Sequence, residues 1–219
     1  MNPLRTLGIA ALSVLAPLLL GCSAGKEPAA DTTVAAAPHD MAGMAGMSGM
    51  SAPVTIPKGA IYTKADVHFM QGMIAHHAQA IFMSRLAASH GANARLLKFA
   101  TKIDQSQMSE ILLMQDWLRA NAQTAPDTSS YHTVMMDGML SADQIKTLEA
   151  ARGPEFDMHF LTMMIQHHEG ALKMVVDLMA SPGAAQDVDV SVFANDVQTV
   201  QTAEIGTMRQ MLEQIPAKP

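Results

Sequence analysis

The stretch that decides the fold is DVHFMQGMIAHHAQAIFM, residues 66–83, which returns 91 residues later as DMHFLTMMIQHHEGALKM, residues 157–174. Nine of the eighteen aligned positions are identical: one Asp, three His, one Phe, two Met, one Ile and one Ala. A duplicated packing unit would preserve mainly aliphatic residues. This repeat preserves imidazoles and thioethers, the side chains that bind soft and borderline transition metals. It therefore predicts a duplicated metal-binding unit.

Helical periodicity extends around both copies of the repeat. The spacing of apolar residues predicts long helices over residues 63–90, 93–121, 154–180 and 187–214, and a short one over 141–152. Thr63 can cap the first helix, Ser141 and Gln144 form a capping-box pattern, and Pro154 suits a helix start. Residues 126–129 are typical of a loop. No alternating apolar and polar stretch is long enough to predict a strand.

The second helix of each half is repeated as well, with an offset of 94 residues. The residues that recur include a Gln, a Glu, an Ile and a Met, and they are Gln107, Glu110, Ile111 and Met114 with Gln201, Glu204, Ile205 and Met208. The repeated unit is therefore a whole helical hairpin. Two such hairpins predict an all-α four-helix bundle, a fold that commonly builds metal sites between facing helices.

The two adjacent histidines of each copy cannot point the same way. At about 100° per residue, His76 and His77 diverge, although Met73 lies one turn before both and can neighbour either. One histidine can ligate while the other bonds a carboxylate, or each can serve its own site. Glu110 and Glu204 lie on apolar stripes and need partners, because burying them alone is costly. They can orient a ligating histidine or bind the metal directly.

The N-terminus is predicted to be a targeting segment. Arg5 precedes a short apolar stretch over residues 7–20 that ends in Leu-Leu-Gly-Cys, which resembles a lipoprotein lipobox. The resemblance implies a signal peptide over residues 1–21 and lipidation of Cys22; an ordinary secretory signal is the alternative. Ser23 after the cysteine implies the periplasmic face of the outer membrane. Cys22 is the only cysteine, so the mature domain has no disulfide and no thiolate ligand.

Two further Met-rich segments lie outside the repeat. Residues 22–57 are rich in Ala, Gly, Pro, Ser and Thr and are predicted to form a disordered tether. Within it, methionines without a core to fill favour capture of Cu(I) or Ag(I), although a linker with incidental methionines is the alternative. Residues 132–139, HTVMMDGM, repeat this composition between the hairpins. That loop can fold over the bundle and add ligands, or Met139 can pin it to the core.

The charge balance argues against a nucleic-acid partner. The chain has 14 Lys and Arg against 20 Asp and Glu, a net charge of −6, and its basic residues are scattered.

The helix pattern Asp-x-x-Phe-x-x-x-Met-Ile-x-His-His-x-x-Ala-x-x-Met, followed by Gln-x-x-Glu-Ile-x-x-Met, resembles a known family. It is similar to the ferritin-like domain-of-unknown-function family that includes the copper-binding protein CopM. The resemblance covers residues 60–215, which leaves residues 58–219 as one duplicated metal-binding domain. It implies a secreted helical protein that binds copper and serves copper tolerance by sequestration or hand-off.

These observations predict a lipid-anchored, non-enzymatic copper-binding protein of the bacterial envelope, with an envelope copper transporter or oxidase as the receiving partner. Sites that use histidine should weaken below the ordinary imidazole pKa of about 6.5. The alternatives are a ferritin-like di-metal oxidase, a helical envelope scaffold whose His and Met only pack, and a zinc protein. Di-iron bundles need Glu-x-x-His pairs, which the repeat lacks. The candidate ligands are His68, Met73, His76, His77, Met83, Glu110, Met114, His159, Met164, His167, His168, Met174, Glu204 and Met208 in the bundle, His39, Met41, Met44, Met47 and Met50 in the tether, and His132, Met135, Met136 and Met139 in the loop.

Overall fold

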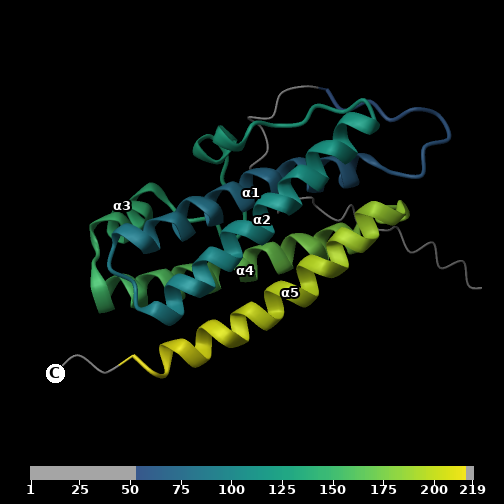
Figure 1. The fold of residues 1–219 in the computed structure, drawn as a ribbon. Coiled ribbons are helices and arrows are strands. Elements are labelled where there is room, and N and C mark those ends of the chain that lie inside the picture. Colours follow the sequence, from purple (N-terminus) through teal and green to yellow (C-terminus); the bar gives the residue numbers. More distant parts are fainter. Residues whose placement is uncertain (1–52, 216–219) are drawn as a thin grey trace, which may run out of the picture. The chain divides into compact units, whose positions relative to one another are not determined.

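The computed structural model describes residues 53–215, and within this range the fold is entirely helical (Figure 1). The predicted signal peptide, Cys22 and the tether ligands His39, Met41, Met44, Met47 and Met50 lie outside the described residues. The elements are α1 (Lys64–Ser89), α2 (Ala94–Ala120), the short 3-10 helix η2 (Thr128–His132), α3 (Ala142–Ala150), α4 (Gly153–Ala180) and α5 (Val188–Leu212).

The helix starts follow from local side-chain chemistry. Thr63 and Asp66 form a capping box at α1, Ser141 and Gln144 form another at α3, and Asn93 caps α2. The predicted helix bounds are confirmed to within a few residues. One difference is the 3-10 helix that begins inside the predicted loop, where the Asp127 side chain accepts a hydrogen bond from the Ser129 backbone N–H.

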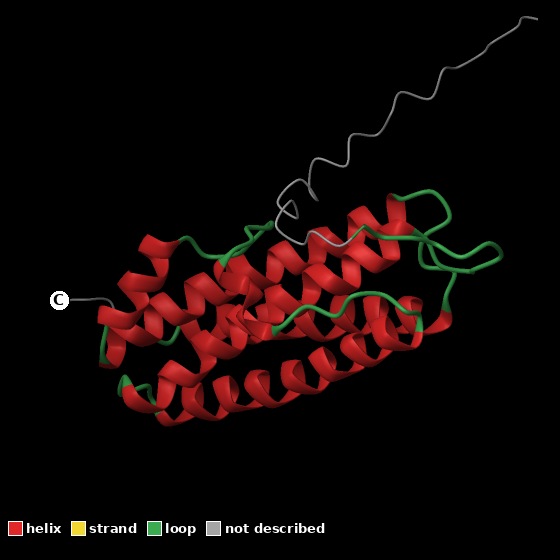
Figure 2. Ribbon diagram, turned by 90° about the horizontal axis from the view of Figure 1, so that it is seen from above, coloured by secondary structure: helices red, strands yellow, loops and turns green. Residues whose placement is uncertain are grey.

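The predicted four-helix bundle of two duplicated hairpins is confirmed. α1 packs along α2, α4 packs along α5, and the hairpins meet through α1 and α4 (Figures 1 and 2). The short helix α3 lies outside the bundle and packs on α4. The two copies of the repeat therefore occupy facing helices of one core.

The Asp that begins each copy of the repeat locks one hairpin to the other. Asp66 Oδ1 accepts from the backbone N–H of Ala185, in the turn between α4 and α5, at 2.7 Å. Asp157 Oδ2 accepts from the Asn93 side-chain amide, in the turn between α1 and α2, also at 2.7 Å. Both carboxylates are buried. The duplicated Asp is therefore retained for assembly of the bundle rather than for a site.

The buried apolar side chains form two clusters, and both copies of the repeat contribute residues to each cluster. One contains Met73 with Met174, and the other contains Met83 with Met164. Along α2, α4 and α5 the chain passes from one cluster to the other at buried polar residues. These residues form a polar layer, together with the histidine pair of α1: His76, His77, Gln107, Glu110, His167, His168, Gln201 and Glu204.

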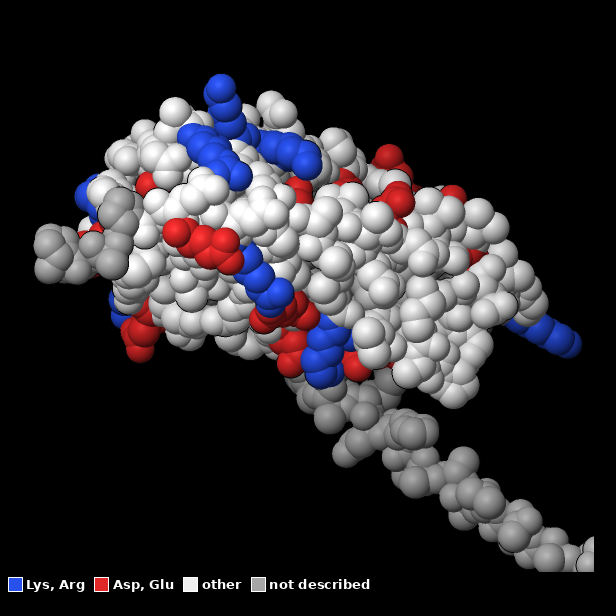
Figure 3. Space-filling view, turned by 90° about the horizontal axis from the view of Figure 1, so that it is seen from below, with Lys and Arg blue, Asp and Glu red and all other residues white. Residues whose placement is uncertain are grey.

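The surface carries local ion pairs and some exposed apolar side chains. On the face shown in Figure 3, acidic and basic side chains are interspersed, with wide uncharged areas between them. Arg119 pairs with Asp116 at 2.8 Å in this manner, while Leu112 and Val188 are exposed. Among the described helices, none combines the length and apolar character needed to cross a bilayer.

Candidate metal centre

The centre of the polar layer is a pair of imidazoles in contact, one from each copy of the repeat. The ring centroids of His76 on α1 and His167 on α4 lie 3.8 Å apart, with 43° between the ring planes. The two side chains are 0% and 1% exposed. Because they occupy equivalent positions of the repeat, their contact joins the two copies of the motif at the same residue.

Both central imidazoles are neutral over a wide pH range. Burial, together with the smaller effect of the neighbouring His77 ring, lowers the pKa of His76 to about 3. Burial and the adjacent His76 ring likewise hold the pKa of His167 well below its ordinary value. The expected loss of histidine sites below pH 6.5 is therefore wrong for this pair. A neutral imidazole keeps the lone pair that a metal requires.

The hydrogen bonds leave specific nitrogens of this pair free. His76 Nε2 lies 3.1 Å from the backbone carbonyl oxygen of Asp137, and because a carbonyl only accepts, Nε2 carries the hydrogen. The lone pair of His76 is therefore on Nδ1, which is buried without a hydrogen-bond partner. His167 makes no hydrogen bond of good geometry through either ring nitrogen. Buried polar atoms without partners are uncommon and suit a ligand.

The second histidine of each pair bonds a glutamate of its own hairpin. His77 Nε2 lies 2.7 Å from Glu110 Oε2, and His168 Nε2 lies 3.0 Å from Glu204 Oε2. The predicted contact between the histidine pair and the two core glutamates is confirmed, and the adjacent histidines do have different partners. The two halves differ in solvent access, since the Glu110 side chain is 24% exposed and that of Glu204 is 5% exposed.

Buried thioethers flank the histidine layer on both sides. Met73 and Met164 each lie one helical turn before a histidine pair, and both are fully buried. The other predicted sulfur ligands of the bundle, Met83, Met114, Met174 and Met208, are also buried in the two apolar clusters. Across residues 53–215, no three His, Asp or Glu side chains converge as a metal site.

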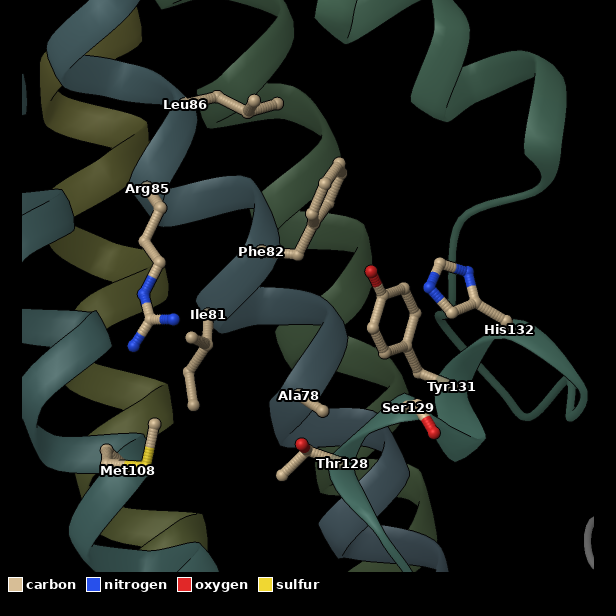
Figure 4. Close-up of a pocket in the computed structure, with 10 residues that line it drawn as sticks. All are labelled: Ala78, Ile81, Phe82, Arg85, Leu86, Met108, Thr128, Ser129, Tyr131 and His132. Carbon is tan, nitrogen blue, oxygen red and sulfur yellow. The ribbon is translucent and has the colours of Figure 1, made fainter.

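Other predicted ligands lie away from this centre. His68 and His159 are half-buried, and the ring contacts and hydrogen bonds among residues 53–215 do not join them to the central pair. His132 is exposed and stacks on Tyr131, with ring centroids 3.9 Å apart, beside a surface hollow of about 410 Å³ (Figure 4). Met135 is 52% exposed, whereas Met136 and Met139 are buried and pin the loop to the core.

Two features of the site were not predicted from the sequence. The first is the Asp137 carbonyl at His76, a backbone group that side-chain patterns do not reveal. The second is the contact of Gly138 with Gly170, where a Cβ on Gly170 would lie 2.0 Å from the Asp137 oxygen. A glycine inside a helix lowers helix stability by about 1 kcal/mol relative to alanine. Gly170, inside α4, was therefore the one residue whose presence in the sequence could have indicated a close backbone approach.

The comparison with known proteins defines the class. The profile of the family described as "Domain of unknown function (DUF305)" matches residues 66–212, and the chain belongs to this family. None of the curated proteins is similar enough in sequence to be recognised as a relative.

Solved structures of the same family share the bundle. A DUF305 protein from Streptomyces coelicolor, described as secreted, is 25% identical with a TM-score of 0.61, and the match covers 70% of this chain and 95% of that one. A DUF305 fragment from Deinococcus radiodurans is also 25% identical, with a TM-score of 0.61 and coverages of 70% and 98%. CopM in its Cu(I)-bound form is 26% identical, with a TM-score of 0.54 and coverages of 68% and 96%. CopM has also been solved in Cu(II)-bound, Ag-bound and apo forms.

Proposed function

We propose that this protein binds copper ions in the bacterial envelope and serves copper tolerance by sequestering them or delivering them to a partner. The observation that carries the proposal is the buried, neutral His76–His167 pair between clusters of buried methionines. Imidazole and thioether together suit Cu(I), and zinc gains little from thioethers. The similarity to CopM, whose structures contain Cu(I), Cu(II) and Ag, supports the same metal class.

Histidines and methionines of the bundle would supply different ligand atoms to the ion. His76 Nδ1 and one nitrogen of His167 would supply imidazole, and Met73 and Met164, one turn away, would supply sulfur. Their burial excludes water and so protects Cu(I). His77 and His168 bond Glu110 and Glu204 through Nε2, and each would bind an ion through its buried Nδ1, which has no hydrogen-bond partner.

We place the protein outside the cytoplasm, anchored at Cys22 and carrying a Met-rich tether that gathers ions for the bundle. The similarity to a DUF305 protein described as secreted is consistent with an envelope location. We expect no catalysis, because a di-iron oxidase would need several carboxylates at one centre and each core glutamate here bonds a separate histidine. Iron-dependent oxygen consumption by the purified protein would contradict this.

The test is metal stoichiometry by elemental analysis after separate equilibration with Cu(I), Cu(II) and Zn(II). The informative variant is His76→Gln/His167→Gln, and the matched control is His68→Gln/His159→Gln, which changes the half-buried histidines of the same repeat. We expect the central pair to be needed for a bundle-bound Cu(I) that the control retains. Equal copper content in all three proteins would refute the central site, and no copper in the wild type would refute the function.

A further inference from the structure

The loop of residues 133–140 is fastened across α1 and α4 at several points. The Asp137 carbonyl accepts from His76 Nε2–H at 3.1 Å, and Leu140 exchanges two hydrogen bonds with the Gln79 side chain, at 2.7 and 3.1 Å. The Asp137 carboxylate also pairs with Lys173 on α4 at 3.0 Å. The loop is therefore held on both helices that carry the central histidines.

Two glycines allow this loop to approach α4 so closely. A Cβ on Gly170 would lie 2.0 Å from the Asp137 oxygen and 2.5 Å from the Gly138 Cα, distances that real side chains do not reach. Gly138 has φ +78° and would place a Cβ 2.7 Å from the Gln166 carbonyl oxygen. The obstacles are backbone atoms, so a side chain at either position must displace the loop.

The repeat shows that this arrangement belongs to one half only. Gly170 occupies the position equivalent to Gln79, and both residues dock the same loop, one by close approach and the other by hydrogen bonds. Within residues 53–215, no hydrogen bond of good geometry holds either ring nitrogen of His167, although the His76 backbone lies near enough to oppose the lowering of its pKa. The two central histidines are therefore equivalent in sequence but held differently.

We propose that Gly138 and Gly170 are positioning residues for His76: their contact brings the Asp137 carbonyl onto Nε2–H and commits the His76 lone pair to Nδ1 in the buried layer. The consequence for copper binding rests on the proposed function, whereas the hydrogen bond between Asp137 and His76 does not depend on it. A ligating histidine whose other nitrogen is hydrogen-bonded has a fixed tautomer and ring orientation. His76 is then the ligand whose orientation is fixed in the apo protein, whereas neither ring nitrogen of His167 makes a hydrogen bond of good geometry.

The test compares Gly170→Ala with Gly206→Ala in the full protein. Gly206 also lies inside a helix, on α5, but a Cβ there meets nothing within 4 Å. Nitrogen-15 NMR of the apo protein reports the His76 tautomer, and a coupling across the hydrogen bond links Nε2 to the Asp137 carbonyl carbon. We expect both signatures in the wild type and in Gly206→Ala, and loss of the coupling with mixed tautomers in Gly170→Ala.

A wild-type His76 protonated at Nδ1, or a Gly170→Ala protein that keeps the coupling, would overturn the proposal. If Gly170→Ala does not fold, Gln79→Ala takes its place, because it removes the two Leu140 hydrogen bonds without adding atoms. Exchange of the His76 Nε2 proton with solvent should then rise about tenfold or more, and unchanged exchange would count against the proposal.

Copper affinity is the second readout. Disturbing the group that orients a ligating histidine typically weakens metal binding about tenfold to a hundredfold, and we expect this of Gly170→Ala but not of Gly206→Ala. Unchanged affinity in Gly170→Ala would refute the positioning role in metal binding. A wild type that binds no copper would refute the proposed function alone, since the tautomer measurement decides the geometry without metal.

Discussion

The stability of the apo protein should fall as the pH is lowered from 7 to 5, because of its two central imidazoles. Burial lowers the pKa of His76 to about 3 and holds the pKa of His167 well below 6.5 in the folded protein. In the unfolded chain both return to about 6.5. Below that pH the unfolded chain takes up protons that the folded protein cannot, so the stability present above pH 6.5 is lost as the pH falls.

The magnitude follows from proton linkage. One group protonated only in the unfolded state contributes about 1.4 kcal/mol per pH unit well below its unfolded pKa. Between pH 7 and pH 5 this amounts to about 2 kcal/mol for His76, and His167 adds a contribution of the same sign. A domain of this size has a total stability of about 5–15 kcal/mol, so the effect is easily measured.

The assay is urea unfolding at pH 7 and pH 5, for the wild type and for His76→Gln/His167→Gln. The two proteins share every other titrating group, including His68, whose pKa is also lowered by partial burial. The quantity of interest is therefore the difference between their two pH dependences, which we expect to be about 2 kcal/mol or more. Equal pH dependences, or a difference below about 1 kcal/mol, would refute the description of the pair as buried and neutral.

Three other changes should have distinct results. Glu204→Ala should lower the free energy of unfolding by about 1–3 kcal/mol. Glu110→Ala should lower it by less, because water can reach the more exposed Glu110 position. Urea unfolding of both variants measures these losses, and equal losses would contradict the difference in burial. Asp66→Ala and Asp157→Ala should each cost about 1.5–3 kcal/mol through lost hydrogen bonds between the hairpins, without changing copper content per folded molecule; a lower copper content would instead make the Asp part of a site. Deletion of residues 22–52 should lower the Cu(I) stoichiometry and leave the melting temperature of the bundle unchanged. An undiminished stoichiometry would refute Cu(I) binding by the tether.

The fold was predictable because each level of the sequence indicates the same arrangement. Thr63, Ser141 and Pro154 mark helix starts, and the doubled hairpin pattern specifies two units with one shared core. The histidine–glutamate bonds followed from the cost of burying Glu110 and Glu204 alone.

The pairing of His76 with His167 needed the structure. Sequence periodicity places both adjacent histidines on the inner sector of a helix, but it does not say which one meets the other hairpin. That choice depends on how α1 crosses α4, which is set by packing of the Met and Phe side chains around them. The contacts of Asp66 and Asp157 with the other hairpin were equally hidden, because a hydrogen bond to a distant turn leaves no local pattern; only the capping box of Thr63 and Asp66 is local.

The acid sensitivity of the site was misjudged for a physical reason. The expectation of weakening below pH 6.5 assumed an imidazole in water, whereas His76 and His167 are 0% and 1% exposed. Burial depth is a property of the assembled bundle, and one sequence does not give it for a particular His.

The most direct test of the central claim is X-ray absorption spectroscopy of Cu(I) bound to the protein lacking residues 22–52. We predict a copper shell that contains both imidazole nitrogen and thioether sulfur, and loss of the nitrogen contribution in His76→Gln/His167→Gln. A shell of nitrogen and oxygen alone, or a spectrum unchanged by that variant, would contradict a copper site at the buried histidine pair.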